Sequence, residues 1–220
     1  MPAVRCWSLR HPHPFPSSGK TLSFIFFKAG RPAMKCTNLW LLGAVLFLAA
    51  CAHKSDDHGE NDIMDSTSFT LTAAAFTEAA PIPVEYACEG ADRSPALEWS
   101  DVPDSTRSFA LTCIDPDAPM GDWVHWLAWD IPGDRRELPA GIDAENQDLL
   151  RQGRNSWRRS GYGGPCPPKG QGPHRYFFRL YALDVETLEV ASPGARKQLE
   201  TALDGHVLGG GQVMGTYERK

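Results

Sequence analysis

Five residues whose side chains titrate or donate hydrogen bonds lie near the ends of three runs that are typical of strands. Asp115 and Asp117 follow the first run, His125 lies at the start of the second, and His174 and Tyr176 open the third. Imidazole and phenol groups can donate hydrogen bonds to the oxygens of an anion, while carboxylates can fix the orientation of imidazoles. These residue types predict an anion-binding site if the fold brings them together.

The three runs are predicted to be strands of one sheet. Residues 108–114 and 123–129 are separated by a turn rich in proline and glycine, which is typical of a hairpin. Residues 176–183 have the aromatic and apolar density of a central strand. Because one strand of a hairpin ends beside the start of the next, we expect Asp115 and His125 to be neighbours.

The composition favours one mainly β domain of ordinary size. The chain has 220 residues, 42% of them hydrophobic, and its 18 prolines and 20 glycines favour a fold with many turns. Shorter strands are predicted at residues 69–71 and 84–86, and a helix at residues 195–203. We treat residues 69–220 as a single domain.

The N-terminal region has the pattern of an export signal. Residues 34–50 have a basic start, an apolar run and a small-residue ending. The ending Leu-Ala-Ala-Cys is similar to a bacterial lipobox, which would place a lipid on Cys51; a plain signal peptide with an incidental cysteine is the alternative. We expect residues 1–33 to be an overcalled extension and residues 51–68 to be a flexible tether. Because Ala52 follows the cysteine, the expected location is the outer membrane, facing the periplasm of a bacterial envelope.

The charge distribution argues against nucleic acid as a partner. The formal net charge is -5, and the first 50 residues hold basic residues but no Asp or Glu, so the domain is more acidic still. One basic cluster stands out in it: Arg151, Arg154, Arg158 and Arg159. We interpret this cluster as a solvated surface by default, or as a patch that draws anions toward a neighbouring pocket.

Four motifs together resemble the phosphatidylethanolamine-binding protein (Raf kinase inhibitor-like) family, in its bacterial branch. They are Asp-Pro-Asp-Ala-Pro at 115–119, Val-His-Trp at 124–126, Tyr-Gly-Gly-Pro-Cys-Pro-Pro at 162–168 and His-Arg-Tyr-Phe-Phe-Arg-Leu-Tyr-Ala-Leu at 174–183. The likeness extends from about Phe69 to Arg219. It implies a large central β-sheet flanked by a smaller antiparallel sheet and short helices, with one anion pocket.

The resemblance also implies which residues form that pocket and what it holds. The expected set is Asp115, Asp117, Pro119, Trp123, His125, Gly164, Pro165, His174 and Tyr176. The implied ligand is phosphate, the phosphoethanolamine headgroup of a phospholipid, or a similar small anion. His125 and Tyr176 would donate to phosphoryl oxygens, while the two carboxylates would orient the histidines or meet an ammonium group. The connector at 120–122 is shorter than in animal members, so kinase binding is not carried over.

The leading hypothesis is a non-enzymatic, membrane-tethered binding protein with a regulatory surface, whose protein partner the sequence does not identify. The alternatives are a hydrolase that uses the Asp and His residues, and an inhibitor of a protease or kinase. The chain has neither a Gly-x-Ser-x-Gly nor a His-Glu-x-x-His motif, so no nucleophile or zinc site is indicated, and no cofactor or metal is expected. Asp115 and Asp117 can also be mere turn residues. We interpret His206 as a buried structural histidine.

Three cysteines follow Cys51, and an oxidising compartment permits one disulfide. Cys88 and Cys166 lie in loop-like segments, whereas Cys113 lies in a predicted strand. We therefore favour a bond between Cys88 and Cys166, although spacing alone leaves the connectivity open.

Overall fold

The computed structural model describes residues 67–145, 149–191 and 193–220. The expected extension, signal peptide and lipidated Cys51 lie outside the described residues, as does most of the tether. Two residues that we assigned to the tether, Thr67 and Ser68, pair with Gly209 and Gly210 in the structure.

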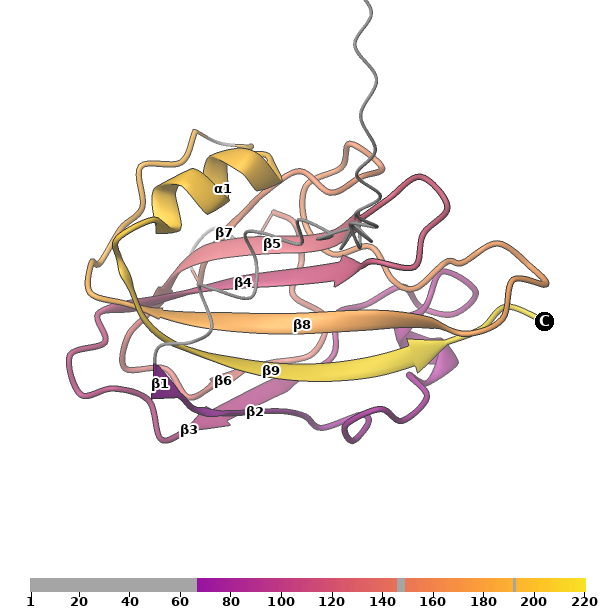
Figure 1. Cartoon of the computed structure of the whole chain (residues 1–220), viewed down its shortest axis with the longest axis horizontal. Coiled ribbons are helices and arrows are strands. Elements are labelled where there is room, and N and C mark those ends of the chain that lie inside the picture. The colour runs from indigo at the N-terminus through magenta and orange to yellow at the C-terminus, as the bar shows by residue number, and fades with distance from the viewer. Residues whose placement is uncertain (1–66, 146–148, 192) are drawn as a thin grey trace, which may run out of the picture. The chain divides into compact units, whose positions relative to one another are not determined.

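A six-stranded sheet forms the centre of the domain (Figure 1). Its strands follow the order β1-β9-β8-β4-β5-β7, and only the short β1–β9 pairing is parallel among the described strands. Their bounds are β1 Thr67–Ser68, β4 Ser108–Asp115, β5 Trp123–Pro132, β7 Arg151–Gln152, β8 His174–Leu183 and β9 Val207–Tyr217. The three strands expected from the sequence are thus adjacent, and β8 lies between β4 and β9.

A smaller antiparallel sheet covers one face of the large one. It contains β2 (Thr70–Ala73), β3 (Leu97–Ser100) and β6 (Glu137–Leu138) in the order β2-β3-β6. Trp99 of β3 packs edge-on against Phe109 of β4, with ring centroids 5.2 Å apart. The inward side chains of both sheets form one apolar core.

A helix covers the other face. Helix α1 (Arg196–Leu203) buries Leu199 and Leu203, which are one turn apart, in a second apolar cluster that includes Trp129 of β5. Because both faces are covered, every residue of β4 is buried. The mainly β fold with two sheets and little helix is as predicted.

Two local predictions are wrong. Residues Val84–Tyr86 form a short 3₁₀ helix, η2, rather than a strand. Pro83 precedes it and its carbonyl accepts the Tyr86 amide at 3.0 Å; a proline, which has no N–H to give to a ladder, favours such a turn. His206 is not a buried histidine, since its side chain is 43% exposed beside Asp184.

Within the described ranges, no helix combines the length and apolar character needed to cross a membrane.

Candidate functional site

The turn after β4 fixes the first carboxylate of the site. One carboxylate oxygen of Asp115, Oδ1, accepts the backbone N–H of Asp117 at 2.8 Å, which closes a local turn at the Asp-Pro-Asp motif. Asp115 is also directly opposite Trp123 in the β4–β5 hairpin. The turn role that we considered as an alternative is therefore real, but it uses only one of the two oxygens.

The second oxygen of Asp115 holds His174. Nδ1 of His174 lies 2.8 Å from Oδ2 of Asp115, and the two side chains are each 4% exposed. The partners come from the end of β4 and the start of β8, which are adjacent strands. This hydrogen bond fixes the orientation of the His174 ring. Because it uses Nδ1, Nε2 is the ring nitrogen that remains for another partner.

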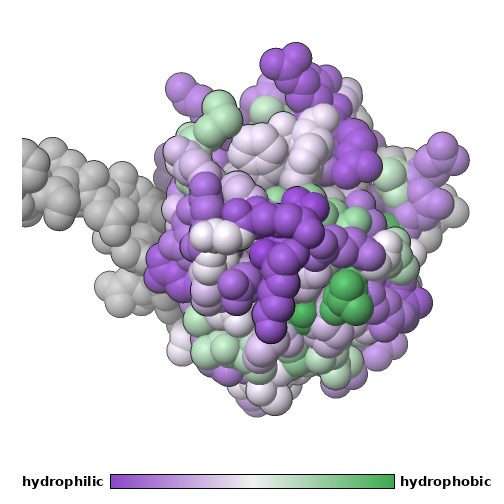
Figure 2. Space-filling view, turned by 90° about the vertical axis from the view of Figure 1, so that its right-hand side faces the viewer, coloured by the Kyte–Doolittle hydropathy of each residue, from purple (hydrophilic) through white to green (hydrophobic). Residues whose placement is uncertain are grey.

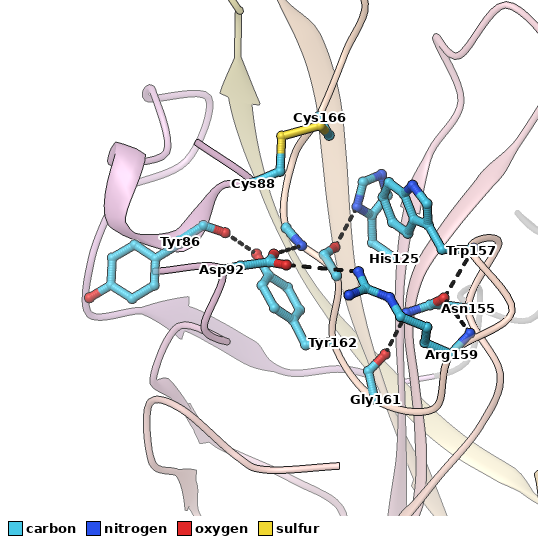
Figure 3. A network of polar contacts seen from close by, with 12 residues as sticks. Tyr86, Cys88, Asp92, His125, Asn155, Trp157, Arg159, Gly161, Tyr162 and Cys166 are labelled. Carbon is cyan, nitrogen blue, oxygen red and sulfur yellow. Dashed lines mark hydrogen bonds and ion pairs between the residues drawn. A yellow bond between two sulfur atoms is a disulfide. The ribbon is translucent and has the colours of Figure 1, made fainter. Parts of the chain in front are cut away.

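His125, at the start of β5, is held by a backbone carbonyl. Its Nδ1 donates to the oxygen of Gly163 at 2.6 Å, and the N–H of Gly163 donates back to the His125 carbonyl at 2.9 Å (Figure 3). Burial lowers the pKa of His125 from 6.5 to about 4, against the opposing effects of the Gly163 carbonyl and the Asp115 charge. The ring is therefore neutral at neutral pH, with its proton on Nδ1.

Aromatic rings surround His125. The rings of Trp157 and Tyr176 each lie edge-on to it, with centroids 5.0 Å away. Trp157 also packs edge-on against Trp123, at 5.4 Å. These contacts remove His125 from water and explain why burial dominates its pKa.

The segment after Trp157 forms one wall and is fastened to residues 86–92 (Figure 3). The Tyr162 hydroxyl donates to the Tyr86 carbonyl at 2.9 Å, and the Gly164 N–H donates to Oδ1 of Asp92 at 2.6 Å. A disulfide joins Cys88 to Cys166, while Cys113 is free and buried. This wall is therefore held by a covalent bond and two long-range hydrogen bonds.

Gly164 fits only because it lacks a side chain. A Cβ atom at this position would lie 2.2 Å from the carbonyl oxygen of Tyr86. The glycine thus permits the close approach of the wall to the 86–92 segment.

Asp117 does not face the pocket. Its carboxylate forms a two-pronged ion pair with Arg175, with Nε at 2.9 Å and Nη2 at 2.6 Å, and it also accepts the Arg175 backbone N–H. Arg175 holds the pKa of Asp117 below its ordinary value. The residue ties the 115–119 turn to β8 and is not available to meet an ammonium group.

Tyr176 is not among the residues that line the pocket either. The side chain is fully buried, and the charged neighbour that acts most strongly on its hydroxyl is the carboxylate of Asp115, which itself lines the pocket. Burial, reinforced by the negative charge of Asp115, raises the pKa of the phenol far above its ordinary value. Its ring packs edge-on against His125, with centroids 5.0 Å apart, and so supports that ring.

These elements enclose a pocket of about 290 Å³ where β4 ends and β5 and β8 begin. Figure 2 faces this end of the domain, where apolar and hydrophilic residues are intermingled on the surface. The lining residues are Asp115, Ala118, Pro119, Met120, Trp123, His125, Trp157, Cys166, Pro167, Pro168 and His174. The pocket has a polar end with two histidines and an otherwise apolar wall.

Five of the nine expected residues line this pocket: Asp115, Pro119, Trp123, His125 and His174. The other four, Asp117, Gly164, Pro165 and Tyr176, are not among the lining residues. The pocket residues expected from the sequence did not include Trp157, the exposed Met120, or the smaller lining residues Ala118, Pro167 and Pro168. The only signal for Trp157 is Asn155 two residues before it, whose Oδ1 accepts the Trp157 N–H at 3.1 Å.

The arginine cluster is not one surface patch around the pocket. Arg159 lies 6.0 Å from the Trp157 ring and 3.8 Å from the Asp92 carboxylate, whereas Arg151 pairs with Asp130 of β5. Among the residues that the structure describes, no group of three or more His, Cys, Asp or Glu side chains is placed to hold a metal ion.

Comparison with known proteins identifies relatives of the whole domain. The family described as "Phosphatidylethanolamine-binding protein" matches residues 72–218. A UPF0098 protein of Aquifex aeolicus is 43% identical over 146 residues, which are 66% of this chain and 85% of that protein. A UPF0098 protein of Pyrococcus horikoshii is 46% identical over 143 residues, covering 63% of this chain and 71% of the relative. The relatives thus include bacterial and archaeal proteins.

Two solved structures share the fold. A putative phosphatidylethanolamine-binding protein homologue of Chlamydia trachomatis superimposes with a TM-score of 0.64 at 38% identity, covering 70% of this chain and all of that one. YbcL of Escherichia coli, described as a new member of the mammalian family, gives the same TM-score at 34% identity, with the same coverage.

Proposed function

Since this chain belongs to the phosphatidylethanolamine-binding protein family, we propose that its pocket binds a small oxyanion, either phosphate or a phosphoryl headgroup such as phosphoethanolamine. Binding-protein character is the family property, whereas the ligand is our proposal. The proposal concerns the polar end of the pocket, between His125 and His174.

The observation that carries the proposal is the way both imidazoles are fixed. Each ring uses Nδ1 to bond to the protein, at 2.6 Å to the Gly163 oxygen and at 2.8 Å to the Asp115 carboxylate. Each ring also lines the pocket, so its Nε2 is the nitrogen left for a ligand. Two oriented imidazoles at the buried end of an otherwise apolar hollow suit a small ligand with several oxygens.

The carboxylates do not support recognition of an ammonium group. Asp115 is occupied by His174 and by the Asp117 amide, and Asp117 is occupied by Arg175. Among the described residues that line the pocket, no carboxylate other than Asp115 could meet an ammonium. The proposal therefore centres on the phosphoryl group.

Calorimetric titration of the purified protein with phosphate and with phosphoethanolamine tests this function. We expect saturable binding in the parent and a ten- to hundredfold weaker affinity in His125→Ala, because a hydrogen bond to a charged ligand is lost. Circular dichroism and thermal unfolding check that the variant is folded. Equal affinities in two folded proteins would mean that the anion binds elsewhere, and release of products from a phosphate ester would favour the hydrolase hypothesis.

We further propose that the domain is tethered to the outer membrane, facing the periplasm, through lipid on Cys51. The support is the Leu-Ala-Ala-Cys ending of the apolar run and the polar stretch that follows it. Cells labelled with palmitate should yield a lipidated product that sediments with the outer membrane. The label should disappear in Cys51→Ser and persist in Cys113→Ser; an unlabelled, freely soluble parent would refute the tether.

A further inference from the structure

The hydrogen bond between His125 and Gly163 decides which ring nitrogen carries the proton. A carbonyl oxygen can only accept, so Nδ1, at 2.6 Å from the Gly163 oxygen, must be the donor. In a neutral imidazole the other nitrogen then has a lone pair and no hydrogen. His125 therefore offers an acceptor to the pocket that it lines.

Burial keeps the His125 ring neutral in spite of two nearby carboxylates. Asp115 at the end of β4 and Asp92 in the segment before β3 face it with negative charge and favour its protonation. Burial opposes them and prevails, and the pKa of His125 falls to about 4. The neighbours from β8 and from the 155–163 segment are the rings of Tyr176 and Trp157, and Tyr176 is uncharged because burial raises its pKa.

His174 has a different partner. Its Nδ1 lies 2.8 Å from the Oδ2 of a carboxylate, Asp115, whereas Nδ1 of His125 lies 2.6 Å from an uncharged backbone carbonyl. Within the described chain, no Lys or Arg lines the pocket. We therefore assign His174 the part of donor to a bound anion and His125 the part of acceptor.

From this arrangement we propose that the pocket selects oxyanions that bring their own hydrogen-bond donor, which Nε2 of His125 accepts. The inference rests on the proposed anion-binding function and narrows its ligand class. A phosphate or phosphomonoester that retains a P–OH group satisfies both histidines. Sulfate carries no proton at neutral pH, so its oxygen lone pairs would meet the lone pair of His125, and a buried polar group would be left unpaired.

The donor can come from either of two parts of a ligand. It can be a P–OH group, as in phosphate, or the ammonium of phosphoethanolamine. Phosphate compared with sulfate tests the first source, because the two ions have the same tetrahedral shape. Phosphoethanolamine compared with phosphocholine tests the second, because phosphocholine has no N–H.

The test is calorimetric titration of the full chain with phosphate and with sulfate at pH 7. We expect phosphate to bind ten- to a hundredfold more tightly. In His125→Gln, a carboxamide can place an N–H where Nε2 stood, so the preference should fall to near unity, while His206→Gln should keep the preference of the parent. Equal binding of both ions by the parent would overturn the inference but leave the anion-binding function intact, whereas no binding of either ion would refute that function itself.

A measurement on the parent alone covers the case in which His125→Gln does not fold. Sulfate can be bound through this ring only when His125 is protonated, so its Kd should rise about tenfold per pH unit between pH 5 and pH 7. The Kd of phosphate should change much less, because the neutral ring accepts its P–OH. Parallel pH profiles for the two ions would overturn the inference.

Discussion

Two histidine–aspartate pairs stand at opposite ends of strand β8 and differ in almost everything except their chemistry. His174 at its start lies 2.8 Å from Asp115, and His206 lies 2.9 Å from Asp184, which follows its last residue. The side chains of the first pair are 4% exposed, and those of the second are 43% and 47% exposed. A polar contact that is exposed to water contributes little, whereas breaking a buried one leaves a polar group unpaired and is costly.

The cavities beside the two pairs differ in volume, and the larger one lies beside the exposed pair. The one beside His206 is larger, about 690 Å³, but it is open and includes exposed side chains of α1 and its flanking turns, such as Lys197 and Asp204. The pocket beside His174 is less than half that volume, yet it encloses buried groups with fixed orientation. The contrast teaches that oriented buried polar groups, rather than the size of a cavity, mark the candidate site.

Replacing each aspartate with asparagine should reveal the largest difference in stability between the two pairs. Asp115→Asn replaces the Oδ2 acceptor of His174 with an amide N–H and should lower the free energy of unfolding by about 1 to 3 kcal/mol, because a buried polar group loses its partner. Asp184→Asn, at the exposed pair, should lower it by less than about 1 kcal/mol. Urea denaturation of both variants measures the difference. Similar losses in the two would mean that burial of the first pair has no energetic consequence.

The pocket end is also covalently fastened, by the disulfide between Cys88 and Cys166. Replacing both cysteines with alanine should lower the free energy of unfolding by about 2 to 5 kcal/mol, since the bond restricts the unfolded chain. A reductant should destabilise the parent by a similar amount and leave the double variant unchanged, which makes that variant the control. A parent that is indifferent to reductant would show that this bond does not stabilise the wall.

Acid should destabilise the pocket end through His125. Its folded pKa, about 4, lies below the ordinary 6.5, so the unfolded chain binds the extra proton first. The stabilising contribution of the neutral ring is fully present above pH 6.5. It is lost as the pH falls from 6.5 toward the folded pKa of about 4, and the loss reaches about 3 kcal/mol at pH 4. Denaturation at pH 7 and pH 4 should show this loss in the parent and in His206→Asn. In His125→Asn, whose side chain does not titrate, the loss of stability between pH 7 and pH 4 should be smaller by about 3 kcal/mol. A loss equal to that of the parent would contradict a buried neutral ring at this position.

The main strands could be predicted because their patterns are local. Alternating apolar residues and a proline- and glycine-rich turn are enough to indicate the β4–β5 hairpin. Residues 84–86 alternate in the same way, but they follow Pro83 and fold into η2, so three residues of pattern were too few to decide.

The site could be predicted only in part, because several of its features arise from long-range contacts. Asp115 and His174 are 59 positions apart and meet only because β4 and β8 are neighbours. Trp157 packs on His125 through a loop whose path no periodicity indicates. The proton on Nδ1 of His125 depends on a carbonyl, which every residue has, so no sequence signal could have placed it.

The central claim is that the anion binds beside the buried His174–Asp115 pair and not beside the exposed His206–Asp184 pair. Phosphate titration by calorimetry, in the parent, His174→Ala and His206→Ala, compares the two ends of β8 directly. The account predicts a ten- to hundredfold loss of affinity in His174→Ala, about 1.5 to 3 kcal/mol, and the affinity of the parent in His206→Ala. Unchanged binding in a folded His174→Ala protein, or a loss confined to His206→Ala, would contradict it.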